Sequence, residues 1–157
     1  MKNFKLDWVL INEIAIGPTP RTENDLQLLK EYNIQSVLSL CSVEEAPPPK
    51  NINNQFNCMR VILPDHRSGR LPYVNEIEEA LNALKLLTKQ SPVFIHCVEG
   101  VERSPLICLA WLIIKKKLNY EHALRYLMEV HPETNPLDGQ IKLINKICQS
   151  SKSDFAN

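Results

Sequence analysis

Short apolar runs alternate with amphipathic stretches along this chain, and the pattern predicts its secondary structure. Runs of about four to eight apolar or β-branched residues, bounded by Gly, Pro or polar residues, are typical of buried strands. Apolar positions that recur every three or four residues are typical of helices with one face on a core. The pattern predicts strands at 8–11, 13–16, 36–41, 58–63 and 93–97, and helices at 23–32, 73–88, 104–116, 120–131 and 138–148. Thr22 and Asn119 are expected to cap the helices at 23–32 and 120–131.

The order of these elements predicts the fold class. Strands alternate with helices up to the helix at 104–116, and the chain is helical after it, which favours an α/β fold. We expect a central, mostly parallel sheet of about four to five strands with helices on both faces. Ligands bind such sheets at the carboxyl ends of the strands. Both Asp65 and Cys97 lie at or just after a predicted strand end.

Length and charge limit the domain organisation and the partners. The 157 residues are enough for one well-buried domain, expected over 1–150, and the polar residues 151–157 are expected to form a disordered tail. The 18 basic residues balance the 18 acidic ones. This balance argues against nucleic acid or an anionic membrane surface as a partner.

The expected location is the cytoplasm. The longest apolar run, 106–114, is about half of the roughly 20 residues that span a bilayer, and the first residues lack the apolar core of a signal peptide. Five irregularly spaced cysteines fit a reducing compartment better than a disulfide framework. We further expect a monomer.

The stretch between the last predicted strand and the helix at 104–116 carries the most chemistry. A loop at this place offers unpaired backbone N–H groups and the positive end of a helix dipole, so it attracts anions. The same field can lower the pKa of a cysteine from about 8.5 to roughly 3.5–7.5. The stretch consists of His96, Cys97, Val98, Glu99, Gly100, Val101, Glu102, Arg103 and Ser104, and residues 97–103 are called the Cys97 loop below.

Within this loop a thiol, a guanidinium and a row of amides can surround one phosphate. We expect Cys97 to be an ionised nucleophile, although buried packing is the commoner role of an isolated cysteine. We expect Arg103 to curl back and donate two parallel hydrogen bonds to phosphate oxygens. The backbone amides of 98–103 would hold the remaining oxygens.

The turn and the helix start after this loop also have suitable residues. Gly100 lies where the turn needs a residue without a Cβ atom. Ser104 is expected to cap the following helix, and Pro105 fits the first helical position. A separate loop after the strand at 58–63 supplies a carboxyl group, Asp65, which can donate a proton to a leaving group.

These residues together resemble one family, the cysteine-dependent protein phosphatases, and specifically their small dual-specificity branch. The resemblance extends over the Cys97 loop, Asp65, the helix between them and the Ser-Pro pair before an apolar helix. It continues through 119–131 and 136–140. It implies a metal-independent enzyme without a cofactor that forms a phosphocysteine at Cys97.

The resemblance also implies the roles of several side chains. Asp65 would act as general acid and then as base for the hydrolytic water, whereas on its own it would be a turn residue after Pro64. Ser104 would hydrogen-bond the sulfur while the intermediate breaks down. His96 would order the loop and tune the thiol, since no second His or Cys lies at a metal-ligand spacing. The substrate would bind to Val98, Glu99, Gly100, Val101, Glu102 and Arg103.

The charges of the Cys97 loop bear on the substrate. Glu99 and Glu102 repel polyanions, which favours a phosphorylated protein carrying phosphotyrosine, phosphoserine or phosphothreonine. A phosphoinositide or an RNA 5′-triphosphate stays an alternative substrate. A phosphate-recognition module without turnover is a further alternative, against which the intact Cys97, Arg103 and Asp65 speak.

A few further residues are open to two interpretations. Cys41 ends a strand that can lie beside 93–97, and in some relatives a cysteine at such a position traps the oxidised nucleophile as a disulfide; buried packing is the favoured alternative. Arg67 and Arg70 would place cations on the rim of the pocket or lie in a solvated loop. Gln140 would position the hydrolytic water or start a helix in solvent.

Overall fold

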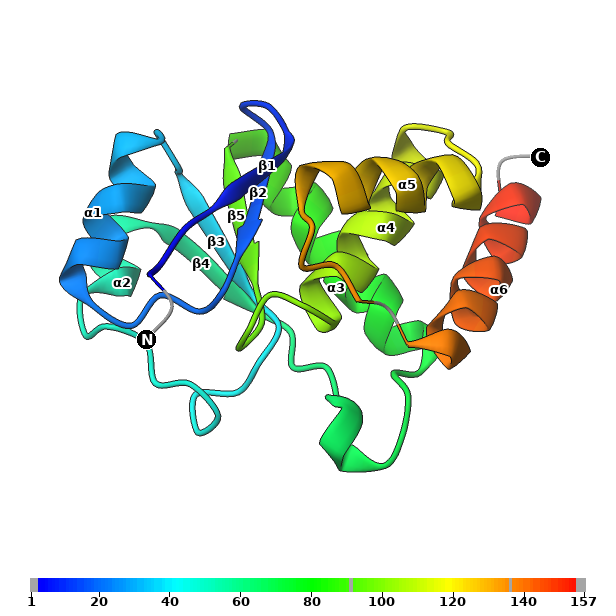
Figure 1. Ribbon diagram of the computed structural model, residues 1–157, viewed down its shortest axis with the longest axis horizontal. Helices are drawn as coiled ribbons and strands as arrows, with labels where there is room; N and C mark the ends of the chain where they lie inside the picture. The colour runs from blue at the N-terminus through cyan, green and yellow to red at the C-terminus, as the bar shows by residue number, and fades with distance from the viewer. Residues whose placement is uncertain (1–2, 91, 136, 155–157) are drawn as a thin grey trace.

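The computed structural model describes residues 3–90, 92–135 and 137–154, and Figure 1 shows its helices and strands. In chain order these are β1 (Asp7–Leu10), β2 (Ile14–Gly17), α1 (Glu23–Glu31), β3 (Ser36–Ser39), α2 (Ile52–Gln55), β4 (Asn57–Arg60), the 3-10 turn η1 (His66–Ser68), α3 (Val74–Leu87), the 3-10 turn η2 (Thr88–Gln90), β5 (Val93–His96), α4 (Arg103–Lys115), α5 (Tyr120–Val130) and α6 (Asp138–Asp154).

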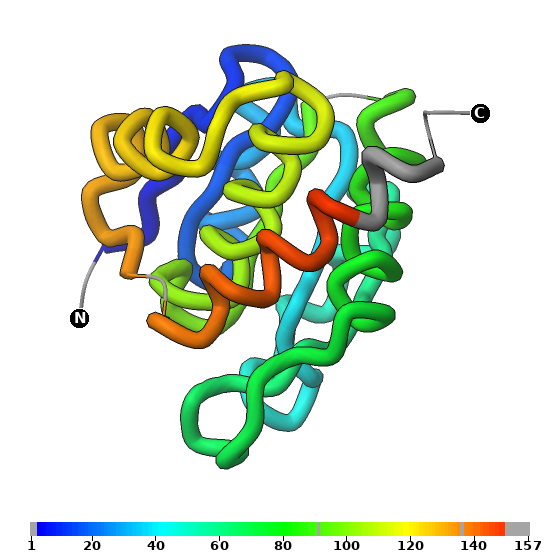
Figure 2. The backbone as a smooth tube through the Cα atoms, turned by 90° about the vertical axis from the view of Figure 1, so that its right-hand side faces the viewer, coloured from blue at the N-terminus to red at the C-terminus, as the bar shows by residue number. Residues whose placement is uncertain are grey.

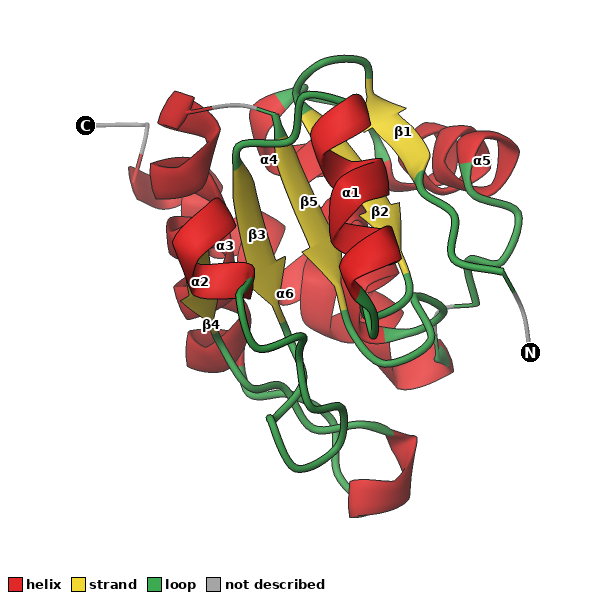
Figure 3. Cartoon of the chain, turned by 90° about the vertical axis from the view of Figure 1, so that its left-hand side faces the viewer, coloured by secondary structure: helices red, strands yellow, loops and turns green. Residues whose placement is uncertain are grey.

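The described strands form one five-stranded sheet with the order β1-β2-β5-β3-β4. Strands β2, β5, β3 and β4 run parallel, and β1 pairs antiparallel with β2. Helices α1 and α2 cover one face, and α3, α4, α5 and α6 cover the other (Figure 3). The expected α/β class, with a mostly parallel sheet between two helical layers, is confirmed.

A hydrophobic core lies on each face of the sheet, and successive residues of β5 point into the two cores alternately, as the two-residue period of a strand requires. Phe94 packs with Leu26 and Leu29 of α1, while Val93 and Ile95 pack on the opposite face with the larger helical layer. All three β5 residues are fully buried. The central strand that leads into the Cys97 loop is therefore fixed from both sides.

The helix ends agree with the expected caps at two places and differ at others. The Thr22 side chain caps α1 and the Asn119 side chain caps α5, as predicted. Helix α2 was not predicted, because a helix of four residues is too short to show a period. Helix α6 continues to Asp154, past the predicted end at Cys148. Of the tail expected at 151–157, residues 151–154 belong to this helix, and residues 155–157 lie outside the described chain.

Several loops meet at the carboxyl end of the sheet. The Cys97 loop follows β5, and the loops after β3 and β4 extend from the same end of the molecule in Figures 2 and 3. Gly17, the last residue of β2, lies against Gly100, which has φ +73. A Cβ atom on Gly100 would lie 2.7 Å from the Gly17 carbonyl group, so this crossing requires glycine.

Candidate active site

A pocket of about 620 Å³ opens at this end of the sheet. Three residues predicted to act together, Cys97, Asp65 and Arg103, all line it although they come from different loops and a helix. The complete lining consists of Glu45, Asp65, His66, Arg67, Cys97, Val98, Glu99, Val101, Glu102, Arg103, Asn135 and Leu137.

The Cys97 thiol lies at the bottom of the Cys97 loop with only 3% of the residue exposed. Its Sγ is 3.3 Å from the Ser104 Oγ. The sequence predicted Ser104 as the cap of α4, and this prediction is wrong. The helix begins one residue earlier, at Arg103, and Glu102 occupies the cap position without a side-chain hydrogen bond. Pro105 accordingly lies inside the first turn. The Ser104 hydroxyl is turned to the sulfur, and no Glu102 side-chain hydrogen bond caps the start of α4.

His96, directly before Cys97, is a neutral ring in this structure. The pKa of His96 is lowered to about 4, mainly by burial; the hydrogen bond to the Cys97 carbonyl opposes this lowering, and the charges of Arg60 and Arg103 add to it. The carbonyl of Cys97, 3.0 Å from Nδ1, can only accept, so Nδ1 carries the proton. Nε2 then accepts from the Ser39 hydroxyl at 2.8 Å. His96 thus ties the start of the Cys97 loop to β3.

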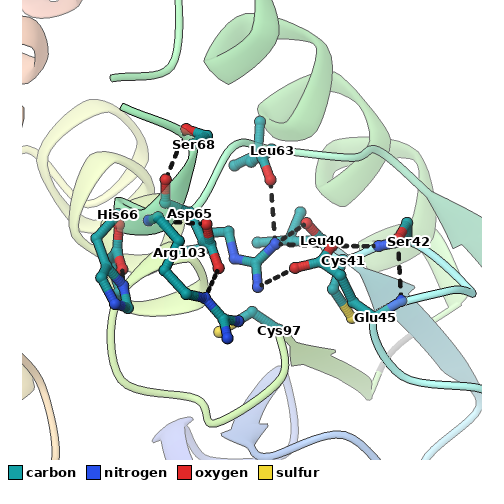
Figure 4. Close-up of polar contacts among 12 residues, drawn as sticks. Leu40, Cys41, Ser42, Glu45, Leu63, Asp65, His66, Ser68, Cys97 and Arg103 are labelled. Atoms are coloured by element: carbon teal, nitrogen blue, oxygen red, sulfur yellow. Dashed lines mark hydrogen bonds and ion pairs between the residues drawn. The ribbon is translucent and has the colours of Figure 1, made fainter. Parts of the chain in front are cut away.

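The Arg103 guanidinium is held in place by Glu45, a residue that sequence reasoning missed. Nη1 and Nη2 lie 3.2 and 3.0 Å from the two Glu45 carboxylate oxygens, and Nη1 also donates to the Leu63 carbonyl at 3.1 Å. Figure 4 shows the guanidinium between Glu45 and Leu63 and beside Cys97. Among the described residues, no hydrogen bond engages Nε, which leaves this edge of the guanidinium for a ligand in the pocket.

Glu45 is ionised in this position. Burial would raise the pKa of its carboxyl, but hydrogen bonds from Arg103 and Ser42 hold it below the usual value. Ser42 contributes a backbone N–H to Glu45 Oε2 at 2.8 Å. A sequence signal existed, because a carboxylate shortly after a strand that ends at the ligand-binding edge is a candidate site residue.

Asp65 is held by its own loop. Its Oδ1 accepts from the Arg67 backbone N–H at 2.9 Å, and its Oδ2 accepts from the Arg67 Nε at 2.8 Å. Burial would raise the pKa of the Asp65 carboxyl, but these hydrogen bonds and the charges of Arg67 and Arg103 keep it below its ordinary value. In this structure Asp65 is therefore a carboxylate and not a proton donor.

A contact between His66 and Glu102 joins the loop that carries Asp65 to the Cys97 loop. His66 Nδ1 lies 2.9 Å from Glu102 Oε2, so the two loops meet at the pocket mouth. Glu99, also in the lining, is exposed. The sequence suggested a carboxylate pair at this loop but not that one member is bound by a histidine.

Other candidate residues lie at or away from the pocket. Arg67 lines it, whereas Arg70 forms an ion pair with Glu76 at 2.8 Å and is not part of the lining. Gln140 is fully buried with its Oε1 accepting from the Leu137 N–H, so it does not start a helix in solvent, and it is not part of the lining either. Cys41 is fully buried after β3, which pairs with β5 as expected.

The described residues contain neither a metal-binding cluster nor a membrane-spanning helix. No group of three or more His, Cys, Asp or Glu side chains in 3–90, 92–135 and 137–154 is placed to hold a metal ion. Over the same residues, none of the helices combines the length and the apolar character that a membrane crossing needs.

The chain is similar in sequence to known proteins. The family model described as dual specificity phosphatase, catalytic domain, matches residues 16–149. Dual specificity protein phosphatase PHS1 of Arabidopsis thaliana is 27% identical over 117 residues, covering 74% of this chain and 12% of PHS1. Phosphatidylglycerophosphate phosphatase PTPMT2 of the same plant is 22% identical over 142 residues, covering 88% of this chain and 61% of PTPMT2.

A solved structure gives the same fold. The crystal structure of Tk-PTP in the active form superposes with a TM-score of 0.78 at 20% identity, covering 92% of this chain and 96% of that one. The chain spans only part of the length of the curated relatives it matches, from 12% of PHS1 to 61% of PTPMT2.

Proposed function

The chain belongs to the dual specificity phosphatase catalytic domain family. From this premise we propose that it is a phosphatase that dephosphorylates proteins through a phosphocysteine intermediate. The substrates are phosphotyrosine together with phosphoserine and phosphothreonine. One observation carries the proposal: Cys97, Arg103 and Asp65 line one pocket, with a neutralising partner in place for each charged side chain.

The first step transfers the phosphoryl group to the enzyme. The Cys97 thiolate attacks phosphorus, a sulfur–phosphorus bond forms, and the bond from phosphorus to the substrate oxygen breaks. Arg103 donates from Nε and Nη2 to the phosphoryl oxygens, and the amides of the Cys97 loop donate to the others. Protonated Asp65 gives its proton to the departing oxygen, so the dephosphorylated protein leaves as an alcohol or a phenol.

The second step returns the thiolate. Asp65, now a carboxylate, takes a proton from a water molecule that attacks phosphorus, and the sulfur–phosphorus bond breaks to give inorganic phosphate. The hydroxyl of Ser104, 3.3 Å from Sγ, donates to the sulfur as negative charge returns to it. Charge and atoms balance without a metal ion or a cofactor.

Substrate binding supplies the protonated form of Asp65. The hydrogen bonds from Arg67 keep Asp65 ionised in this structure, and a phosphate dianion in the pocket would compete for the same guanidinium. The negative charge of the phosphate next to the carboxylate also raises the pKa of a carboxyl group. Both effects favour the acid form only when a substrate is present.

This argument predicts a pH effect of Arg67→Gln. Because activity falls as pH rises through the pKa of the acid, and because Arg67 lowers that pKa, removing the guanidinium should move the falling limb of kcat/KM to higher pH. The limb is measured from about pH 3 to pH 8 with phenyl phosphate, a substrate whose leaving group is poor. Arg70→Gln is the matched control, since Arg70 pairs with Glu76 instead. An unmoved limb in Arg67→Gln would show that this contact does not govern the acid.

The charge of the pocket supports a protein substrate over a polyanion. Glu99 and Glu102 line the pocket at the Cys97 loop, and Glu45 lies on its far side. Glu45 is paired with Arg103 and Glu102 with His66. The exposed carboxylate of Glu99 is therefore the one best placed to repel additional phosphates around the one being hydrolysed. A lipid phosphate is the second candidate, because PTPMT2 is named as a phosphatidylglycerophosphate phosphatase.

A substrate panel distinguishes these classes. We expect kcat/KM on phosphotyrosine and phosphothreonine peptides to exceed that on phosphatidylinositol phosphates, phosphatidylglycerophosphate and 5′-triphosphorylated RNA by at least about tenfold. Glu99→Gln should reduce this difference by raising kcat/KM on the polyanionic substrates. Glu121→Gln, at an exposed position of α5, should leave kcat/KM on all of them unchanged. A preference for the lipids in the unmodified protein would reverse the substrate assignment and keep the phosphatase.

The disulfide between Cys41 and Cys97 stays a prediction. Burial raises the pKa of the Cys41 thiol, although the charges of Arg103 and Arg60 partly offset this rise. A mostly protonated thiol attacks slowly, which favours packing as the role of Cys41. The cytoplasmic location and the monomeric state also stay predictions.

A further inference from the structure

His131 is a buried side chain outside the pocket that bridges two distant parts of the fold. It follows the last residue of α5 and is 1% exposed. Its Nδ1 lies 2.7 Å from Asp7 Oδ2, in the first residue of β1. Its Nε2 lies 2.6 Å from the carbonyl oxygen of Gly100, in the Cys97 loop.

Both partners of this ring are hydrogen-bond acceptors. A backbone carbonyl can only accept, and an aspartate carboxylate accepts and does not donate. Both ring nitrogens of His131 must therefore carry a proton, and the ring is an imidazolium paired with Asp7. His96 shows the contrasting case, since its Nε2 meets a hydroxyl that can donate.

The bond to Gly100 fixes the direction of an amide in the pocket. A trans peptide unit is planar, and its C=O and N–H point in opposite directions. The Gly100 carbonyl belongs to the same unit as the Val101 N–H, so a donor behind the loop turns this N–H toward the pocket, which Val101 lines. A positively charged donor also polarises the peptide unit and strengthens its N–H as a donor.

Neighbouring peptide units are held in the same way. The Val98 carbonyl accepts from the Thr19 N–H at 3.0 Å, and the Val101 carbonyl accepts from the Asn135 N–H at 2.9 Å. These two donors are backbone N–H groups, so replacing the side chain of Thr19 or Asn135 leaves the donor in place. Of the three outward bonds, the one from His131 is made by a side chain and carries a charge.

We propose that His131, held as an imidazolium by Asp7, is a positioning residue that aims the Val101 amide at the bound phosphate. This inference rests on the proposed function, because it assigns an outward bond to phosphate binding in the Cys97 loop. His131 does not touch the phosphate. It acts through the Gly100 peptide, and Gly100 itself lies close against the Gly17 carbonyl group.

The test compares His131→Gln with His122→Gln, a control at an exposed position of α5. Losing an aimed amide should lower kcat on an aryl phosphate by about ten- to a hundredfold, with a smaller change in KM, because these amides fit the transition state best. The inhibition constant of orthovanadate should rise in the same variant. In that variant, added inorganic phosphate should no longer shift the Val101 amide resonance. His122→Gln should match the unmodified protein in all of these.

A second measurement does not depend on activity. Ring nitrogen resonances of the unmodified protein at pH 7 should show a proton on both nitrogens of His131. Asp7→Asn should remove this signature, because the asparagine Oδ1 still accepts a hydrogen bond but carries no negative charge. A singly protonated His131, or unchanged kcat and orthovanadate inhibition in His131→Gln, overturns the inference. If the unmodified protein neither hydrolyses aryl phosphates nor binds phosphate, the proposed function fails as well.

Discussion

We expect Cys97→Ser to lower kcat on an aryl phosphate by a factor on the order of 10⁴ to 10⁶, the scale seen when a covalent nucleophile is removed. A serine hydroxyl has nearly the shape of the thiol, but it is not ionised near neutral pH. The loop with its amides and Arg103 remains, so phosphate binding should persist. The measurement is hydrolysis in the presence of a chelator, together with calorimetric binding of a phosphotyrosine peptide.

The chelator and a second cysteine supply the controls. The unmodified protein should keep its full activity when the chelator is added, since neither step uses a metal ion. Cys148→Ser, in α6 and outside the pocket lining, should hydrolyse the substrate at the unmodified rate. Residual turnover in Cys97→Ser well above one part in about 10⁴ would contradict a phosphocysteine mechanism.

Asp65→Asn should give the second largest effect, and its size should depend on the leaving group. A positioned acid contributes about 10²- to 10⁴-fold when the departing oxygen is strongly basic. We expect a loss in this range with phenyl phosphate and with phosphoserine peptides. With p-nitrophenyl phosphate the departing oxygen is stable as an anion, so the loss should be much smaller.

The ratio of the two losses is what identifies a general acid. Asp138→Asn, an exposed carboxylate in the first turn of α6, is the matched control and should leave both rates unchanged. An equal loss with both leaving groups would instead indicate that Asp65 supports the structure of its loop, for which its hydrogen bonds to Arg67 give a basis.

The main features of the fold followed from local patterns. The alternation of apolar strands with amphipathic helices is present in the sequence because each element buries a face whose period differs between strand and helix. Cap residues at Thr22 and Asn119 bind within their own first turn, and both predictions were confirmed. The predicted end of α6 was wrong, because its last residues are polar and show no apolar period, while the backbone hydrogen bonds of the helix continue through them.

The start of α4 shows where a local rule fails. Serine before proline is a good cap sequence, but the Ser104 hydroxyl lies 3.3 Å from the Cys97 sulfur instead of bonding a helix amide. The turn of the Cys97 loop brings sulfur and hydroxyl together, and the helix starts at Arg103 as a result. A contact with the sulfur therefore replaces the expected helix cap.

The sequence alone determined the Cys97 loop, the family and the α/β class, because the loop's chemistry is contiguous and lies between a strand and a helix. Only the tertiary structure decided what surrounds the loop. Glu45 is 58 residues from Arg103, and Asp7 is 124 residues from His131. Hydrogen bonds depend on the direction of each group within a few ångströms, and strands that fold back from distant positions set those directions.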